Sequence, residues 1–158
     1  YVFIGDHTYL MAPSELVTAL QEDWKGTVVL SENHGAQSIR ALQMGSAGRS
    51  FGNELRHRDP ASNRLEGDYV KLDLAKNAES MGARAWNVAT PDELRTALQE
   101  ARKERRSCVI VVETEKHNYG PDSGVWWDIS PAEVTSDPVT QDLRRQYEKI
   151  RESQRFHG

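Results

Sequence analysis

The sequence contains a single cysteine, and this scarcity excludes two common ways of stabilising a protein. Cys108 cannot form a disulfide within the 158-residue chain or build a zinc site from several thiolates. It lies in the apolar run CVIVVET, where a buried structural thiol is favoured over a reactive one. We therefore expect a reducing, cytoplasmic setting.

Long apolar runs and an excess of one charge are also missing. No stretch approaches the roughly 18 to 20 apolar residues that cross a bilayer, and no signal peptide is visible. The chain carries 20 basic and 24 acidic residues, a net charge of −4, which gives no general attraction to nucleic acid or to an anionic membrane. Neither is expected as a partner.

Apolar strands that alternate with helical patterns are the main feature of the sequence. Short apolar or β-branched runs predict strands at 1–4, 27–30, 69–72, 85–90 and 108–114. Helical spacing predicts a helix from 14 to about 21–25, a short turn at 39–42, and helices before Gly82, from Thr90 and from Asp137. Because several of these strands do not alternate in polarity, we predict an α/β fold with a mainly parallel sheet and helices on both faces.

Two helix starts carry clear capping signals. Thr90, Pro91 and Glu93 form a capping box with proline at the first helical position. Asp137 and Pro138 begin a last helix, which carries Leu143, Tyr147 and Ile150 on one face.

The chain divides by composition into a main domain and a tail. Residues 1–125 are predicted to form the α/β domain, and residues 126–158 an aromatic segment with a helix packed on it. Trp126 and Trp127 are expected either under that helix or at a subunit interface. Residues 44–67, rich in Gly, Ser, Asn and Arg, predict a long functional or mobile connection.

An acid follows the first predicted strand and an amide follows the second. Ligands of open parallel sheets bind beyond the carboxyl ends of the strands, so Asp6 and Asn33 converge if the two strands are neighbours. The backbone carbonyl of Gly35 is unobstructed by a side chain. One carboxylate and two neutral oxygens suit Mg²⁺ that takes its other ligands from water and phosphate. The backbone N–H groups of His7 and Thr8, with the Thr8 hydroxyl, would then face the phosphates.

A simpler interpretation stays open at this point. Asp6 can cap a turn, and Asn33 can belong to an ordinary Asn-His-Gly turn without any ligand. His34 adjoins this loop and is a candidate to face a cofactor, whereas the other histidines after His7 are expected at the surface.

A family resemblance favours the metal. Gly5-Asp6 followed by ENHG resembles the thiamine-diphosphate motif, which begins Gly-Asp-Gly and ends in Asn-Asn or a variant. The segments GDHTYLMAPSELVTALQE, SENHGAQSIRALQMG, SFGNELRHRD, GDYVKLDLAKNAESMGA and SGVWWDISPAEV together resemble the C-terminal, diphosphate-binding domain of thiamine-diphosphate enzymes. They are most similar to the acetolactate-synthase-like trihydroxycyclohexanedione hydrolases of myo-inositol catabolism.

The resemblance implies a thiamine-diphosphate-binding fold and a set of site residues. Mg²⁺ would be held by Asp6, the Asn33 side chain and the Gly35 carbonyl, while Gly5, His7 and Thr8 face the diphosphate. It implies hydrolytic C–C cleavage of a cyclic polyhydroxylated dione, in a homo-oligomer. No catalytic residue is assigned.

The sequence departs from the family pattern at four positions, one of which is Ala36, a smaller residue than is usual just after the Asn-x-Gly turn. His7 stands where the motif has its second glycine, so its imidazole either crowds the diphosphate or donates a hydrogen bond to it. In QEDWKGTVV we expect glycine near Asp23 and an apolar residue at Gly26. These changes leave open a second interpretation, a domain that keeps the fold as a scaffold or interaction domain without cofactor or catalysis.

The extent of the chain also limits what it does alone. It opens in an apolar run without Met, so we expect a piece that lacks the first strands of its domain. The pyrimidine-binding domain, whose glutamate activates the cofactor in this class, is expected from elsewhere in the protein or from a partner subunit. The chain alone is therefore predicted to be inactive.

Overall fold

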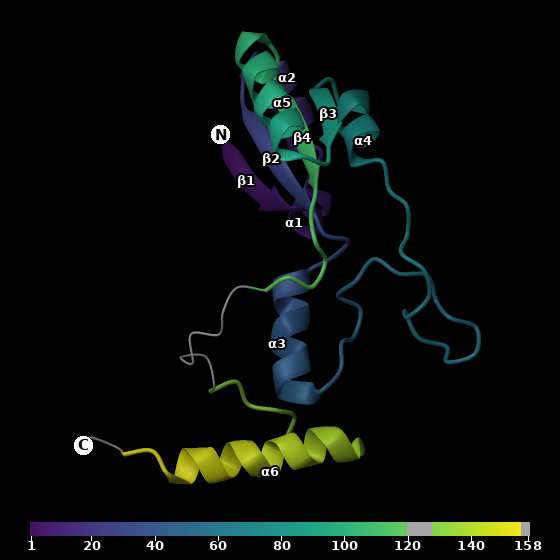
Figure 1. Ribbon diagram of the computed structural model, residues 1–158, viewed down its shortest axis with the longest axis vertical. Coiled ribbons are helices and arrows are strands. Elements are labelled where there is room, and N and C mark those ends of the chain that lie inside the picture. Colours follow the sequence, from purple (N-terminus) through teal and green to yellow (C-terminus); the bar gives the residue numbers. More distant parts are fainter. Residues whose placement is uncertain (120–127, 156–158) are drawn as a thin grey trace. The chain divides into compact units, whose positions relative to one another are not determined.

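The structure is a computed structural model that describes residues 1–119 and 128–155 (Figure 1). It comprises two units. The first consists of Tyr1–Ala36 and Glu54–His117, and the second of Gln37–Asn53 and the described part of Asn118–Gly158. Trp126, Trp127 and the predicted domain boundary between 125 and 126 lie outside the described residues, so those expectations remain predictions.

A four-stranded parallel sheet forms the centre of the first unit. Its strands are β1 (Val2–Gly5), β2 (Thr27–Glu32), β3 (Arg84–Val88) and β4 (Cys108–Glu113). The order across the sheet is β1-β2-β4-β3, and every neighbouring pair is parallel (Figure 1). The predicted parallel sheet is confirmed, with apolar β2 and β4 at its centre.

Helices cover both faces of this sheet. On one face, α1 (Asp6–Met11), α2 (Glu15–Gln21) and α4 (Leu74–Ser80) pack over a core that includes Leu30 and Val109. On the other face, α5 (Pro91–Lys103) covers Cys108 and Ile110. Successive residues of β4 point to opposite faces and are fully buried on both, as expected of a central parallel strand.

The predicted helix caps of α5 and of the last helix are confirmed. The Thr90 side chain accepts a hydrogen bond from the Glu93 N–H, and the Glu93 carboxylate accepts one from the Thr90 N–H. Asp137 caps α6 (Pro138–Glu152) by accepting a hydrogen bond from Thr140 N–H at 2.9 Å. No helix in the described part of the chain is both long and apolar enough to span a membrane.

The second unit pairs α6 with α3 (Gln37–Ala47). The buried Thr140 hydroxyl donates to the Ala47 carbonyl at 3.3 Å and joins the start of α6 to the end of α3. The apolar face predicted for the last helix lines a groove with α3, through Leu143, Tyr147 and Ile150.

Two local predictions were wrong and one helix was missed. The turn at 39–42 is part of the eleven-residue helix α3. The helix expected from 14 is confirmed as α2, but the sequence pattern did not predict α1, which precedes it across Ala12 and Pro13. Residues 69–72 do not form a strand: Tyr69 makes a single antiparallel bridge with Arg56, and the adjacent Val70 N–H donates to the Leu55 carbonyl at 2.8 Å.

Two departures from the family pattern have a structural reason. Asp23 follows the end of α2 in a left-handed conformation, with φ of 48°, which is the position where glycine is most often found. At Gly26, a Cβ atom would lie 2.6 Å from the ring of Trp24, so the absence of a side chain makes room for the indole.

The conformation of Asp23 predicts a stabilising substitution. Asp23→Gly should raise the free energy of unfolding by roughly 0.5–1 kcal/mol, because glycine adopts positive φ without steric cost. The neighbouring Glu22, with φ of −89°, provides the control: Glu22→Gly should lower the same quantity by a similar amount. Urea unfolding of the two variants measures both, and an unchanged or lower stability of Asp23→Gly would contradict the expectation.

Candidate functional site

The Asp6 carboxylate lies between the carboxyl ends of two neighbouring strands. Asp6 directly follows β1 and is only 1% exposed. Its Oδ2 accepts hydrogen bonds from the backbone N–H groups of Asn33, at 3.1 Å, and Gly35, at 3.0 Å. The parallel register of β1 and β2, with Gly5 opposite Ser31, brings the two strand ends together. The structure thus groups the three residues predicted to bind Mg²⁺.

The loop after β2 turns sharply at these residues. His34 and Gly35 both have positive φ, 61° and 149°, and the glycine value is one that side chains disfavour. The His34 carbonyl accepts a hydrogen bond from the Leu55 N–H at 2.9 Å, and Gly35 forms an antiparallel bridge with Glu54. The turn is therefore held by the Asp6 carboxylate and by the segment that begins at Glu54.

The residues predicted to face a diphosphate begin at the end of β1. Gly5 has no atom within 4 Å of the place where a Cβ would lie. Thr8 is exposed, whereas His7 is half-buried. The His7 N–H donates to Asp6 Oδ1, and the His7 Nδ1 is buried without a hydrogen-bond partner among the described residues. The structure brings these residues next to Asp6, and their roles remain predictions.

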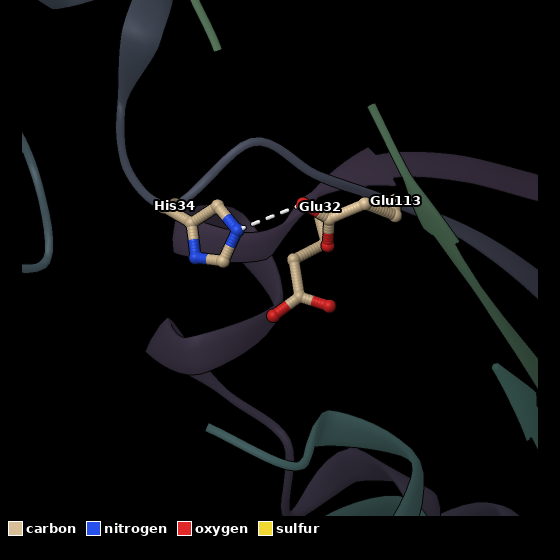
Figure 2. A group of neighbouring side chains, drawn as sticks. All are labelled: Glu32, His34 and Glu113. Atoms are coloured by element: carbon tan, nitrogen blue, oxygen red, sulfur yellow. Dashed lines mark hydrogen bonds and ion pairs between the residues drawn. The ribbon is translucent and has the colours of Figure 1, made fainter. Parts of the chain in front are cut away.

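A cleft opens at the carboxyl ends of β2, β3 and β4. Its volume is about 510 Å³, and it is lined by Glu32, His34, Lys71, Leu72, Asp73, Asn87, Val88, Ala89, Glu93, Val111 and Glu113. Figure 2 shows His34 and Glu113 directed toward each other, with the side chain of Glu32 beside them. His34 Nε2 lies 3.1 Å from Glu113 Oε1. His34 therefore lies in the cleft, as a residue that faces a ligand would.

The cleft has a strongly acidic wall. Burial raises the pKa of the Glu32 carboxyl above its ordinary value. His34 opposes this shift, and the charges of Glu113, Asp6 and Asp73 add to it. Carboxylates from three other segments therefore repel that of Glu32 at this edge of the sheet.

A polar network holds the segment beyond the turn. The Tyr69 hydroxyl donates to Glu54 at 2.5 Å and accepts a hydrogen bond from the Arg56 guanidinium at 2.8 Å. The Arg56 guanidinium also lies 3.9 Å from the centre of the Tyr69 ring. His117 Nε2 is 2.9 Å from Glu54 Oε1, so the network also reaches the chain after β4. The ring of Tyr69 lies 5.2 Å from that of His34 and forms one side of its surroundings.

Sequence reasoning missed two of the three glutamates that line the cleft. Glu32 and Glu113 are the last residues of β2 and β4, and they face each other in the register of the sheet. The sequence did contain a signal for these glutamates, because β2 and β4 each end in an acid, just as β1 is followed by Asp6. It becomes informative only when β2 and β4 are known to be neighbours.

Comparison with known proteins shows the family of the chain. Residues 1–112 match the family described as "Thiamine pyrophosphate enzyme, C-terminal TPP binding domain". The match covers most of the chain, which therefore belongs to this family. The fold expected from the resemblance is confirmed.

Several curated relatives of the chain are named as the same hydrolase. A protein of Bacillus cereus named "3D-(3,5/4)-trihydroxycyclohexane-1,2-dione hydrolase 1" is 36% identical over 141 residues, which are 89% of this chain and 22% of that protein. A protein of Geobacillus thermodenitrificans, named as the same hydrolase, is 35% identical over 161 residues, 99% of this chain and 25% of that protein. The chain thus spans about a quarter or less of the length of these relatives.

Solved structures support the fold. The chain superposes on a thiamine diphosphate-dependent 4-hydroxybenzoylformate decarboxylase of Rhodococcus jostii with a TM-score of 0.58 and 22% identity, covering 72% of this chain and 19% of that one. A benzoylformate decarboxylase of Polynucleobacter necessarius gives a TM-score of 0.59, also at 22% identity, with the same coverage of both chains. At this identity the likeness concerns the fold alone.

The contacts of Asp6 predict that it stabilises the fold without any metal. Asp6→Ala leaves three backbone N–H groups without their acceptor and should lower the free energy of unfolding by roughly 2–4 kcal/mol. Asp92→Ala, which removes a carboxylate that is 90% exposed, should change it by about 0.5 kcal/mol or less. Both are measured by urea unfolding in the presence of a chelator. Equal stability of the two variants would contradict the structural role of Asp6.

Proposed function

We propose that this chain is the magnesium- and diphosphate-binding part of a thiamine-diphosphate enzyme that hydrolyses a C–C bond in a cyclic polyhydroxylated dione. One observation carries the proposal: the buried Asp6 carboxylate at the end of β1 is hydrogen-bonded to the backbone of Asn33 and Gly35 at the end of β2. These are the three residues for which the family resemblance implies a metal.

The geometry at Asp6 fits a magnesium ion with few protein ligands. A carboxylate offers about four lone-pair sites, and three of those of Asp6 accept backbone hydrogen bonds from His7, Asn33 and Gly35. One site remains for a single metal bond. With the Asn33 amide oxygen and the Gly35 carbonyl, this donor set leaves the other positions of an octahedral ion to water and phosphate.

The open space beside Gly5 supports diphosphate binding at the same strand end. The exposed Thr8 side chain supplies a hydroxyl donor there, and the buried His7 Nδ1 can act as a second one when it carries a proton. Thiamine diphosphate, when bound, supplies a carbanion for attack on a ketone and a ring that stores the electrons of the broken bond. The proposed role of the residues of this chain is to bind and orient the cofactor, and His34, in the adjoining cleft, is proposed to face it.

The substrate class and the partners are proposed from the relatives. Their names describe a hydrolase of a trihydroxycyclohexanedione, so a small cyclic polyol dione is the proposed substrate and myo-inositol catabolism the proposed context. Since the chain corresponds to a quarter or less of those proteins, we place the pyrimidine-binding domain elsewhere in the whole protein or in a partner subunit of a homo-oligomer. A cytoplasmic location, without nucleic acid or membrane as partner, belongs to the same proposal.

Two observations favour a second candidate function. The Asp6 carboxylate accepts three backbone hydrogen bonds without a metal, and His7 occupies the position of a motif glycine. A chain that has lost the cofactor would keep its fold through the same hydrogen bonds. The alternative is therefore a scaffold or interaction domain without cofactor or catalysis.

Calorimetric titration with thiamine diphosphate distinguishes the two functions. In the presence of Mg²⁺ the 158-residue chain should give a saturable heat, and a chelator should abolish it, because the metal joins the diphosphate to the protein. Asn33→Ala should remove the signal and the exposed control Asp92→Ala should retain it. The absence of a magnesium-dependent heat would contradict the proposal and support the scaffold.

The same titration tests the effect of His7. This residue lies in α1 and is not among the residues with positive φ, so its backbone conformation does not require glycine. If the imidazole crowds the diphosphate, His7→Gly should tighten binding about tenfold, equivalent to about 1.4 kcal/mol. Unchanged affinity would contradict crowding as the effect of His7.

A further inference from the structure

Three side chains at the carboxyl edge of the sheet converge from separate segments (Figure 2). Glu32 ends β2, Glu113 ends β4, and His34 follows Glu32 by two residues. Glu32 and Glu113 are partners in the parallel register of these strands. One carboxylate oxygen from each glutamate and one imidazole nitrogen of His34 all lie within 4.8 Å of one another. This spacing allows one ion to contact all three.

We propose that Glu32, His34 and Glu113 form a second metal site, which binds a divalent transition metal such as Zn²⁺. It shares no residue with the set proposed for Mg²⁺, Asp6, Asn33 and Gly35. The two sets alternate along the chain from the last residue of β2 onward. Glu32 and His34 belong to the proposed second site, and Asn33 and Gly35 belong to the proposed Mg²⁺ site. The Asp6 carboxylate binds the backbone of that second pair, whereas the His34 side chain is directed at Glu113 and the Glu32 carboxylate lies beside them (Figure 2).

The charges around the cluster favour a cation. Among the described residues, no lysine or arginine forms an ion pair with Glu32, although Glu113 lies close to it. The Lys116 Nζ forms an ion pair with Glu113 Oε1 at 3.6 Å, a distance at which no hydrogen bond forms, and this oxygen is also the one that faces His34 Nε2. A divalent ion between the two carboxylates would offset their repulsion.

The ligand types select the kind of metal. An imidazole with two carboxylates suits Zn²⁺ or Mn²⁺, whereas Mg²⁺ prefers oxygen ligands alone. His34 is 17% exposed at its side chain, and its ring is held near Tyr69, so the imidazole needs little ordering to bind. Three protein ligands leave at least one position free, on the side of the cleft of about 510 Å³. A water molecule or an oxygen of a bound ligand can occupy it.

Titration of the 158-residue chain with zinc chloride, in excess Mg²⁺ to occupy the Asp6 set, tests this site. The wild-type chain should bind one Zn²⁺ ion saturably. His34→Gln and Glu113→Gln should each weaken that binding about 100-fold or more, because each removes a direct ligand. The exposed His57 provides a matched control, and His57→Gln should bind Zn²⁺ as the wild type does.

A second measurement covers variants that fail to fold. In the wild-type chain, Zn²⁺ should shift the imidazole NMR resonances of His34 and leave those of His57 in place. Wild-type affinity in folded His34→Gln, no saturable binding, or equal shifts at both histidines would overturn the proposal. Because the readout is zinc binding without thiamine diphosphate, its failure is distinguishable from failure of the proposed cofactor site.

Discussion

A carboxylate that is almost fully buried must be met by hydrogen-bond donors, and Asp6 accepts two of its hydrogen bonds from the turn that follows the neighbouring strand. Its contacts with the backbone of Asn33 and Gly35 join the end of the edge strand β1 to the turn after β2. That turn contains two successive residues with positive φ, which requires support from its surroundings. The positions of Asn33 and Gly35 in this turn depend on this one interaction.

The parallel sheet accounts for the acidity of the site. Parallel strands end at the same edge, so acids at or just after the strand ends, Asp6, Glu32 and Glu113, gather there. Asp6 is compensated by backbone N–H groups, whereas Glu32 and Glu113 face each other across a cleft. The same topology thus generates a site suited to a hard ion with phosphate and, next to it, one suited to a metal that accepts imidazole.

Local signals predicted much of the fold. The apolar runs of β2 and β4 and the capping box at Thr90 depend on neighbours in sequence, and the structure confirms them. The predicted strand at 69–72 was wrong because an apolar segment forms a strand only where a partner pairs along its length. Here the contact with 55–57 is limited to a single bridge. Asp6 and Asn33 could be paired from sequence since consecutive parallel strands are often adjacent. His34 and Glu113 are 79 residues apart, and only the order β2-β4 brings them together.

Amide hydrogen exchange at Asn33 and Gly35 tests the role of Asp6 most directly. With Asp6 Oδ2 as acceptor, both amides should exchange slowly in the ligand-free chain, and Asp6→Ala should accelerate them roughly 10- to 100-fold, the loss of about 1–3 kcal/mol of local stability. The amide of Val109 in the central strand β4 reports whether the fold persists in the variant. Fast exchange of both amides in the wild-type chain, or no change in the variant, would contradict the structural role assigned to Asp6.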